Sequence, residues 1–340
     1  MKLTNKKTRI TILFIFAIAF SVIAQKQSVF DALPDDEVIS VRLETNMKQL
    51  INKKFDEKYQ PGEFEFLSGP LEGKKYDIQV KPRGNIRKEI CAFPPLMLKF
   101  PKTEFEFRKV KMVQICRNTS QMEDLVLKEY LAYKLYQELT DNSFKVRLLK
   151  VLYEGERPGS KEMNRYAFFI EPKKEVADRI GGKVYEPKVT KVDVLERFHY
   201  NTMTMFQYLI SNTDWAIENL HNMTLVASKE LNAVITIPYD FDYSGLVNAY
   251  YAVPHKTVPI EHVTERYNKS HCMTMDEMKE IRALVLEQKD ELIACVENFT
   301  SLSEDNRKKI LHSFDKCFDA IENEKVCRNI FVRNCKEISN

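Results

Sequence analysis

The sequence predicts an α+β fold in two parts, because the spacing of its hydrophobic residues changes along the chain. Alternating apolar and polar residues, a pattern typical of strands, dominate residues 37–116. Apolar residues at helical spacing follow in residues 121–139 and in most of the chain after residue 172. The chain has 340 residues, 44% of them hydrophobic. That length suits about two domains of roughly 100–200 residues each.

The first 24 residues are typical of a secretory signal peptide. Four basic residues precede a largely apolar run of 14 residues, 10–23. Ala24 follows this run, at the position expected directly before a cleavage site. An uncleaved membrane anchor is the alternative, but a membrane span needs about 20 apolar residues. We therefore expect an exported protein, periplasmic, cell-surface or secreted, with no membrane span after cleavage.

The remaining chain divides into a linker and two lobes. Residues 25–36 are mostly polar and are expected to form the linker. Residues 37–172 are expected to form a β-rich N-lobe with one long helix over 121–139, where leucines recur at i, i+4 spacing. Pro172 ends the last strand of this lobe.

Residues 173–340 are expected to form a mainly helical C-lobe that carries a catalytic loop and C-terminal helices. One helix ends shortly before Asp214, and two short strands follow, the second running into Asp240 and Asp242. The carboxylates therefore lie on a short β insert within a helical lobe. Together with the β-rich first lobe and its single long helix, this order predicts a protein kinase-like two-lobed fold.

Composition and motifs exclude several classes of function. A net charge of +3 is too small to indicate a nucleic-acid partner. The chain has neither of the glycine-rich loops of P-loop and Rossmann proteins, so any nucleotide has to be held in another way. It also lacks the H-E-x-x-H spacing of zinc hydrolases and the G-x-S-x-G motif of serine hydrolases.

The seven cysteines indicate disulfides, because exported chains fold where thiols oxidise. Cys91 and Cys116 lie beside neighbouring strand-like segments and are the best candidate pair. Cys327 and Cys335 are a second candidate pair that would clip the C-terminal tail. The three cysteines within residues 272–317 stay unassigned, and buried free thiols are the alternative throughout.

Asp214 is the candidate catalytic carboxylate. An Asp after a helix is also a common N-cap, so the residues that follow decide between the two interpretations. Asn222 directly precedes a strand, where an amide oxygen suits a metal ion. Asn219 competes with it, because Asp214-x-x-x-x-Asn219 has the spacing of a kinase catalytic loop. His221 is expected to orient the loop, and loop residues that bond their own backbone are the alternative for the two asparagines.

Asp240 and Asp242 are candidate metal ligands together with Asn222. They alternate at the end of a predicted strand, which places both carboxylates on one face. Two like charges so placed repel unless a cation lies between them, which indicates Mg²⁺ or Mn²⁺. A solvated strand end is the alternative, and the aromatic residues on both sides of each carboxylate argue against it.

Three charged residues are candidates for holding a nucleotide. Lys99 ends an alternating strand and is the best candidate for contact with ATP phosphates, with a plain edge charge as the alternative. The Arg83 guanidinium offers several hydrogen-bond donors to a phosphate, and the glycine after it lets a phosphate approach the backbone closely. A simple β-turn is the alternative for this segment. Glu129 on the long helix is the expected partner of Lys99, and Glu123 and Glu138 compete with it.

These motifs together resemble the CotH family of atypical secreted kinases and, more distantly, HipA-type kinases. The resemblance covers about residues 75–245. It lies in Arg83-Gly84-Asn85, the strand that ends at Lys99-Phe100, Asp214, His221-Asn222, and Pro238 to Gly245. It implies that Asp214 is the catalytic carboxylate and that Asn222 and Asp240 bind metal. It also implies that Asp242 is a second acidic ligand and that Lys99 contacts phosphate. Tyr239 stands where the family has Trp, and Ile86-Arg87 replace the usual serines.

The sequence therefore predicts an exported atypical protein kinase that transfers phosphate from ATP to a protein hydroxyl with Mg²⁺ or Mn²⁺. A non-catalytic envelope or surface binding protein on the same scaffold is the alternative. Such a protein has no need for Asp214, Asn222 and Asp240 to converge. A metal-dependent hydrolase with the same carboxylates is a third interpretation, which requires an open site for water and no nucleotide groove.

Overall fold

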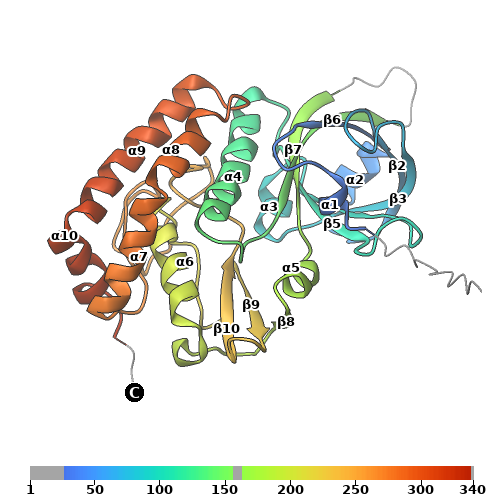
Figure 1. Cartoon of the computed structure of the whole chain (residues 1–340). Coiled ribbons are helices and arrows are strands. Elements are labelled where there is room, and N and C mark those ends of the chain that lie inside the picture. Colours follow the sequence, from blue (N-terminus) through green and yellow to red (C-terminus); the bar gives the residue numbers. More distant parts are fainter. Residues whose placement is uncertain (1–26, 156–162, 338–340) are drawn as a thin grey trace, which may run out of the picture.

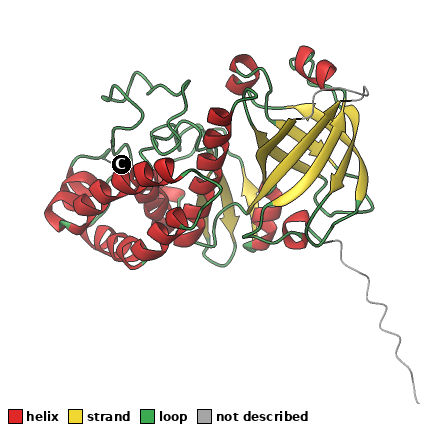
Figure 2. Cartoon of the chain, turned by 90° about the horizontal axis from the view of Figure 1, so that it is seen from above, coloured by secondary structure: helices red, strands yellow, loops and turns green. Residues whose placement is uncertain are grey.

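A closed β-barrel and a group of helices lie on either side of one long helix, α4 (Ser120–Leu139) (Figure 1). The computed structural model describes residues 27–155 and 163–337, so the predicted signal peptide lies outside the described residues. Figure 2 shows the barrel strands on one side of the molecule and most helices on the other. Helix α4 therefore contacts both halves of the chain.

Seven strands form the barrel in the order β1-β2-β3-β4-β5-β7-β6. Their bounds are Ile39–Thr45 (β1), Gln60–Phe66 (β2), Lys75–Pro82 (β3), Leu96–Lys99 (β4), Lys109–Gln114 (β5), Val146–Gly155 (β6) and Met163–Ile170 (β7). Burial alternates along β1, where Val41 and Leu43 are fully buried and Arg42 between them is not. This alternation is expected of strands with one face toward a core.

The α+β class agrees with the structure, but the prediction of a protein kinase-like two-lobed fold is wrong. The β-rich part is a closed mixed barrel, because β1 pairs in parallel with β6, joining Ile39 to Leu149 and Thr45 to Gly155. All other neighbouring barrel strands are antiparallel. The closing pair joins segments on opposite sides of α4 in the chain, and alternation within a strand carries no information about such a distant partner.

The helical part holds a small sheet and most of the longer helices of the described chain. The sheet has the order β10-β9-β8, and its strands are Gly182–Tyr185 (β8), Met223–Ser228 (β9) and Ala233–Pro238 (β10). The helices are α6 (Arg197–Leu209), α7 (Met275–Glu287), α8 (Lys289–Glu297), α9 (Glu304–Glu322) and α10 (Glu324–Arg328). Among the described helices, none is both long and apolar enough to cross a membrane.

Several short helices lie before, between and after the barrel strands. They are α1 (Val29–Ala32), α2 (Met47–Asn52), α3 (Ile86–Ile90) and α5 (Lys173–Arg179). Helix α1 lies in the segment expected to be a linker. Its Val29 and Phe30 are buried, and Arg147 donates hydrogen bonds to the Phe30 and Leu33 carbonyls. The described part of that segment is therefore fixed to the barrel.

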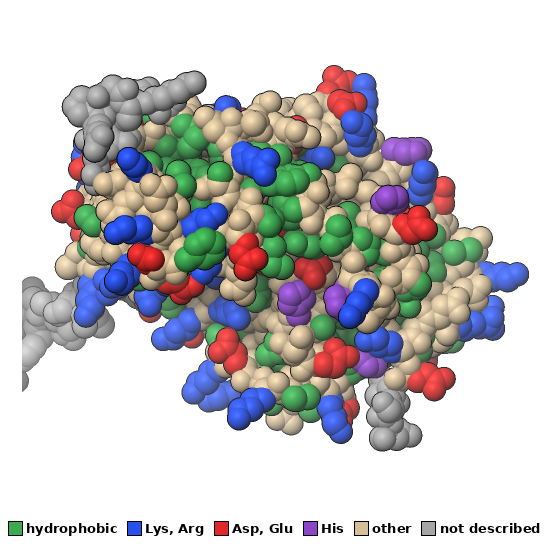
Figure 3. Space-filling model, turned by 180° about the vertical axis from the view of Figure 1, so that it is seen from behind, with side chains coloured by type: hydrophobic (Ala, Val, Ile, Leu, Met, Phe, Trp, Pro, Cys, Tyr) green, Lys and Arg blue, Asp and Glu red, His purple; other side chains and the backbone are tan. Residues whose placement is uncertain are grey.

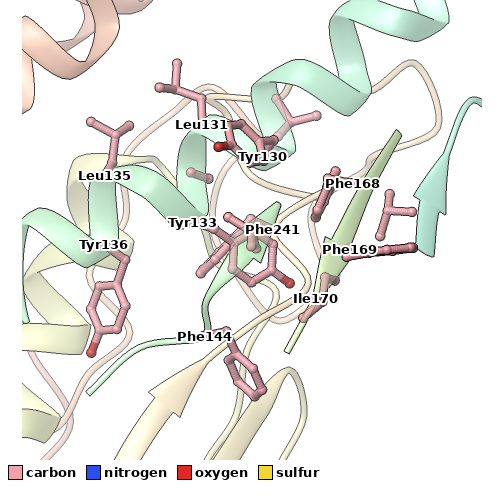
Figure 4. Close-up of a cluster of buried hydrophobic side chains, with 14 of the residues drawn as sticks. Tyr130, Leu131, Tyr133, Leu135, Tyr136, Phe144, Phe168, Phe169, Ile170 and Phe241 are labelled. Carbon is pink, nitrogen blue, oxygen red and sulfur yellow. The ribbon is translucent and has the colours of Figure 1, made fainter. Parts of the chain in front are cut away.

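An aromatic cluster joins α4 to the barrel and to the segment after β10 (Figure 4). Tyr133 on α4 packs edge-on against Phe241, with ring centroids 4.8 Å apart, and lies 5.7 Å from Phe168 on β7. Phe206 on α6 contacts Phe241 from another side, with ring centroids 5.7 Å apart. All four rings are buried, so the residues on either side of Phe241 are tied to the core.

Two disulfides are present among the described residues. Cys91 is joined to Cys116, the pair that the sequence favours, and this bond links the end of α3 to the residues after β5. Cys272 is joined to Cys335, so the expected pairing of Cys335 with Cys327 is wrong. Cys327 is buried with a free thiol, while the Cys272 segment runs beside the C-terminal segment.

Candidate functional site

A cleft of about 460 Å³ lies between the loop after β3 and the β9–β10 hairpin. Its charged, imidazole and amide side chains are Arg83, Asn85, Arg87, Lys111, Lys173, Asp214, Asn219, His221, Asn222, Asp240 and Asp242. The structure thus brings Arg83, the two asparagines and the three aspartates of the predicted site into one cleft. Lys99 and Glu129 do not line it.

The loop that carries Asp214 is fixed by hydrogen bonds before and after it. The side-chain oxygen of Asn212 accepts the Asp214 N–H at 2.9 Å, and the Asn212 carbonyl accepts the Trp215 indole N–H at 3.1 Å. Lys269 donates to the Thr213 carbonyl at 2.9 Å. Asp214 is only about one-third exposed, so its carboxylate is held in place while still open to the cleft.

The Asp214 carboxylate has a partner on each oxygen. His221 Nε2 lies 2.9 Å from Oδ1, and the Asn222 side-chain amide donates to Oδ2 at 2.8 Å. The hydrogen bond to Asp214 raises the pKa of His221 above its ordinary value, because it stabilises the protonated ring. Since a carboxylate has about four lone-pair sites, Asp214 can still accept a proton from a third group.

Asn222 is oriented by the same two neighbours. Its backbone adopts a φ of 53°, and its amide nitrogen donates to both the carboxylate and the carbonyl of Asp214 at 2.8 Å. The side-chain oxygen is left for another partner. In Asn219 the side-chain oxygen instead accepts the His221 N–H at 3.3 Å. The geometry therefore favours Asn222 over Asn219 as an oxygen donor to a metal.

Asp240 and Asp242 do not alternate on a strand, so that expectation is wrong. Strand β10 ends at Pro238, and Asp240 has a left-handed φ of 64°. The Asp240 N–H donates to the Tyr133 hydroxyl at 2.9 Å, while Phe241 enters the core. As a result the Asp240 side chain is 40% exposed and that of Asp242 only 6%, although both line the cleft.

Arg87 on α3 joins three carboxylates of the site. Its Nε lies 2.8 Å from Asp242, and one terminal nitrogen lies 2.5 Å from Glu129 and 4.0 Å from Asp240. Tyr251 donates a further hydrogen bond to Asp242 at 2.9 Å. Burial raises the pKa of Glu129 to about 8 and raises that of Asp242, although Arg87 opposes both shifts. With a pKa of about 8, Glu129 is largely protonated at neutral pH, so the charge of Arg87 is left to balance that of Asp242.

The opposite wall of the cleft is basic. Lys111 on β5 lies 5.1 Å from the centre of the Tyr239 ring, and Lys173 lies 5.4 Å from the same ring. Burial, with a smaller contribution from the charge of Arg83, lowers the pKa of Lys111 to about 8. Three cations and an aromatic ring thus face the carboxylates across the cleft, an arrangement that suits a polyanion with an attached planar group.

Lys99 and Glu129 do not form the pair that the sequence predicts. Lys99 pairs with Gln79 and Lys109 in the barrel, and its ammonium lies 5.5 Å from the Tyr59 ring, away from the cleft. Lys111 is the cleft residue of this region, and Glu129 is paired with Arg87 instead. The sequence pattern places Lys99 at the end of a strand. Whether that end lies near the cleft depends on how the barrel strands pair, which the pattern does not show.

Sequence reasoning missed Arg87, Lys111 and Tyr251. The sequence marks Arg87 only as a residue that replaces a usual serine of the CotH family after Arg83-Gly84-Asn85. Its role was missed because no sequence pattern predicts helix α3. Lys111 alternates with apolar neighbours as any exposed strand lysine does. Tyr251 lies in irregular chain, where spacing gives no hint that its hydroxyl meets Asp242.

The oxygen donors of the cleft fit a hard divalent cation. Asn222 offers an amide oxygen, and Asp240 and Asp242 offer carboxylates, which are ligands that Mg²⁺ and Mn²⁺ prefer. Within residues 27–155 and 163–337 there is no group of three or more His, Cys, Asp and Glu placed to hold a metal. A metal here would therefore need the amide oxygen, water or substrate phosphate to complete its coordination.

Comparison with known proteins leaves the family open. No protein-family model and no curated protein matches the chain. One solved structure that it resembles is the Helicobacter pylori proinflammatory kinase CtkA, at 9% identity and a TM-score of 0.42. That match covers 73% of this chain and 93% of the other. At this TM-score the likeness establishes neither a shared fold nor a shared activity, and membership of the CotH family stays a prediction.

Replacement of Arg87 is expected to destabilise the fold, because it leaves Glu129 and Asp242 buried without their cation. We expect Arg87→Met to lower the free energy of unfolding by about 3–5 kcal/mol in urea titrations at pH 7. Arg83→Met is the matched control, since Arg83 lines the same cleft but forms no ion pair with any described residue, and we expect a loss below about 1 kcal/mol. Equal losses in the two variants would contradict the bridging role of Arg87.

Proposed function

We propose that this protein is an exported enzyme that transfers a phosphoryl group from ATP to a protein hydroxyl with Mg²⁺ or Mn²⁺. The observation that carries the proposal is the convergence of Asp214, Asn222, Asp240 and Asp242 in one cleft whose other wall is basic. Phosphoryl transfer needs these parts together, because its catalysis is mostly positioning and neutralisation of phosphate charge.

The acidic side of the cleft would hold the metal. Asn222, Asp240 and Asp242 supply three oxygen donors, and Arg87 keeps Asp242 in place from behind. These residues would hold a divalent cation, whose charge would neutralise part of the negative charge on the phosphate oxygens. The exposed Asp240 is accessible to the cation, whereas the buried Asp242 requires that Arg87 and Tyr251 retain their contacts with it.

The basic side would hold the nucleotide. Arg83 and Lys111 are placed to contact phosphate oxygens, and Lys173 lies beside Tyr239 at the same wall. Lys111 takes the role that the sequence assigns to Lys99. The Tyr239 ring stands where the resemblance implies Trp and offers a flat apolar surface to a planar group.

Asp214 is the residue placed to accept the proton. The substrate oxygen attacks the γ-phosphorus, the bond from that phosphorus to the β–γ bridging oxygen breaks, and the hydroxyl proton passes to the Asp214 carboxylate. ADP leaves with the electron pair of the broken bond. His221 and Asn222 are positioning residues here, because each holds one oxygen of the Asp214 carboxylate.

Export and a protein substrate are supported by different features. Two disulfides are typical of chains that fold outside the cytoplasm. The face seen in Figure 3 carries acidic and basic side chains interspersed with hydrophobic ones. A mixed surface of this kind suits contact with a protein better than contact with nucleic acid, which favours a continuous basic patch.

Loss of the proton acceptor is expected to abolish most activity. We expect Asp214→Asn to slow transfer of ³²P from γ-labelled ATP to the protein itself or to a general acceptor protein by about 10²- to 10⁴-fold. Asp193→Asn, at an exposed residue outside the cleft, is the control and should retain the wild-type rate. The proposal fails if the wild type transfers no phosphate with either metal or if the two variants behave alike.

Nucleotide binding should depend on the charge of Lys111. Its pKa of about 8 means that the ammonium is present below pH 8 and is lost as the pH rises above it. We therefore expect the affinity for ATP with Mg²⁺, measured by calorimetry, to be constant near pH 7 and to fall as the pH rises from 8 to 9.5. In Lys111→Arg the fall should disappear, because arginine stays protonated.

Lys109→Arg is the control for this pH profile, since Lys109 is exposed two residues earlier on β5. It should show the wild-type fall in affinity. A wild-type affinity that does not change across pH 8, or the same fall in Lys111→Arg, would exclude Lys111 from the phosphate contacts.

A further inference from the structure

A second pocket, of about 340 Å³, lies between the end of α6 and helix α9. Residues near the segments that carry Asp214 and Asp242 also line it. Its floor is formed by Ile210 and Leu246, which are joined by a hydrogen bond from the Leu246 N–H to the Ile210 carbonyl at 3.1 Å. Gly245 beside them donates its N–H to the Ser211 carbonyl at 2.9 Å. A Cβ on Gly245 would lie 2.5 Å from the Val263 carbonyl oxygen, so this floor is closely packed.

The wall of this pocket carries only positive formal charge. Its ionisable residues are Lys128, Arg266, Lys309, His312 and Lys316, and no Asp or Glu lines it. Lys128, Arg266 and Lys316 form no ion pair with any described residue, although Asp124 and Asp305 lie near enough to favour the charged form of Lys128. Lys309 is paired with Asp305 on the outer surface at 2.7 Å. The cleft described above differs, because cations and carboxylates face each other there.

Arg266 is held as a fixed donor at the base of the pocket. One terminal nitrogen donates to the Ser313 carbonyl at 2.7 Å, to the Ser313 hydroxyl at 2.8 Å and to the Leu209 carbonyl at 3.2 Å. Its Nε is buried and has no hydrogen-bond partner. Burial also lowers the pKa of Lys128, which is a further sign that this side chain lies partly out of water. The charge of Arg266 is therefore fixed in position before any ligand binds.

We infer that this pocket, the Arg266 pocket, binds a phosphomonoester dianion. A phosphate group offers three acceptor oxygens and nearly two negative charges at neutral pH, which suits a pocket lined by several cations and by no Asp or Glu. A volume of about 340 Å³ lies within the range of small-ligand sites and leaves room for the side chain that carries the phosphate. A phosphorylated residue of a protein and free inorganic phosphate share this chemistry.

The inference does not rest on the proposed kinase activity, because phosphate binding is measured without ATP or metal. Its location nevertheless connects it to the cleft. Ile210 and Ser211 lead directly into the loop of Asp214, and Gly245 and Leu246 follow Asp242. A ligand in the Arg266 pocket therefore contacts the rear of both segments that carry the cleft carboxylates.

Binding is tested on the purified full chain at pH 7.5 and low salt by calorimetry with phosphoserine, inorganic phosphate and unmodified serine. We expect the wild type to bind the two phosphates and not serine. Lys309→Glu with Lys316→Glu changes two exposed residues of the rim and is expected to weaken phosphate binding at least tenfold. Tighter binding of phosphoserine identifies a phosphorylated side chain as the ligand, and equal binding identifies free phosphate.

One control variant separates this pocket from general charge effects. Lys308→Glu with Lys325→Glu makes the same change in net charge at exposed positions that line neither the pocket nor the cleft. It should bind phosphate within twofold of the wild type. No binding by the wild type, or an equal loss in this control, would overturn the inference.

Discussion

The contact between Phe241 and Tyr133 is the interaction on which the rest of the site depends. Phe241 lies between two carboxylates in the chain, and its burial on α4 fixes the backbone of both. Tyr133 also accepts the Asp240 N–H, so one side chain of α4 holds the ring and the adjacent peptide. Asp240 consequently faces the open cleft, and Asp242 is directed toward buried partners. An aromatic pair of this kind contributes about 0.5–1.5 kcal/mol beyond the burial of its area.

The barrel contributes the other half of the site through α3. Arg87 reaches Glu129 on α4 and Asp242 after β10, so a single guanidinium joins three elements from distant parts of the chain. The Cys91–Cys116 disulfide anchors the end of α3 near these contacts. The site is therefore held between the barrel and the helical part, with α4 as the element common to both. This shared support keeps the acidic and basic walls of the cleft at a fixed separation.

The sequence predicted which residues gather around the β9–β10 hairpin. It did not predict which distant strands pair in the barrel. Asp214, Asn222 and Asp240 share a cleft because a hairpin of β9 and β10 follows a helix, and each of these steps has a local pattern. The barrel closes through β1 and β6, which no local pattern relates. The sequence pointed to Lys99 and missed Lys111 for the same reason, since only the pairing of distant strands shows which lysine lines the cleft. Asp242 and Glu129 both contact Arg87, which the sequence did not mark as their partner because it lies on a helix too short to predict.

The central claim is that the cleft binds a metal and a nucleotide together, and thermal unfolding of the purified protein tests it most directly. Ligand that binds only the folded state stabilises it by about 2.7 kcal/mol at 100 times its dissociation constant, which raises the midpoint. The account predicts a rise that needs both ATP and Mg²⁺ or Mn²⁺ and that disappears in Asp240→Ala. No rise in the wild type with any combination of ATP and either metal would contradict it.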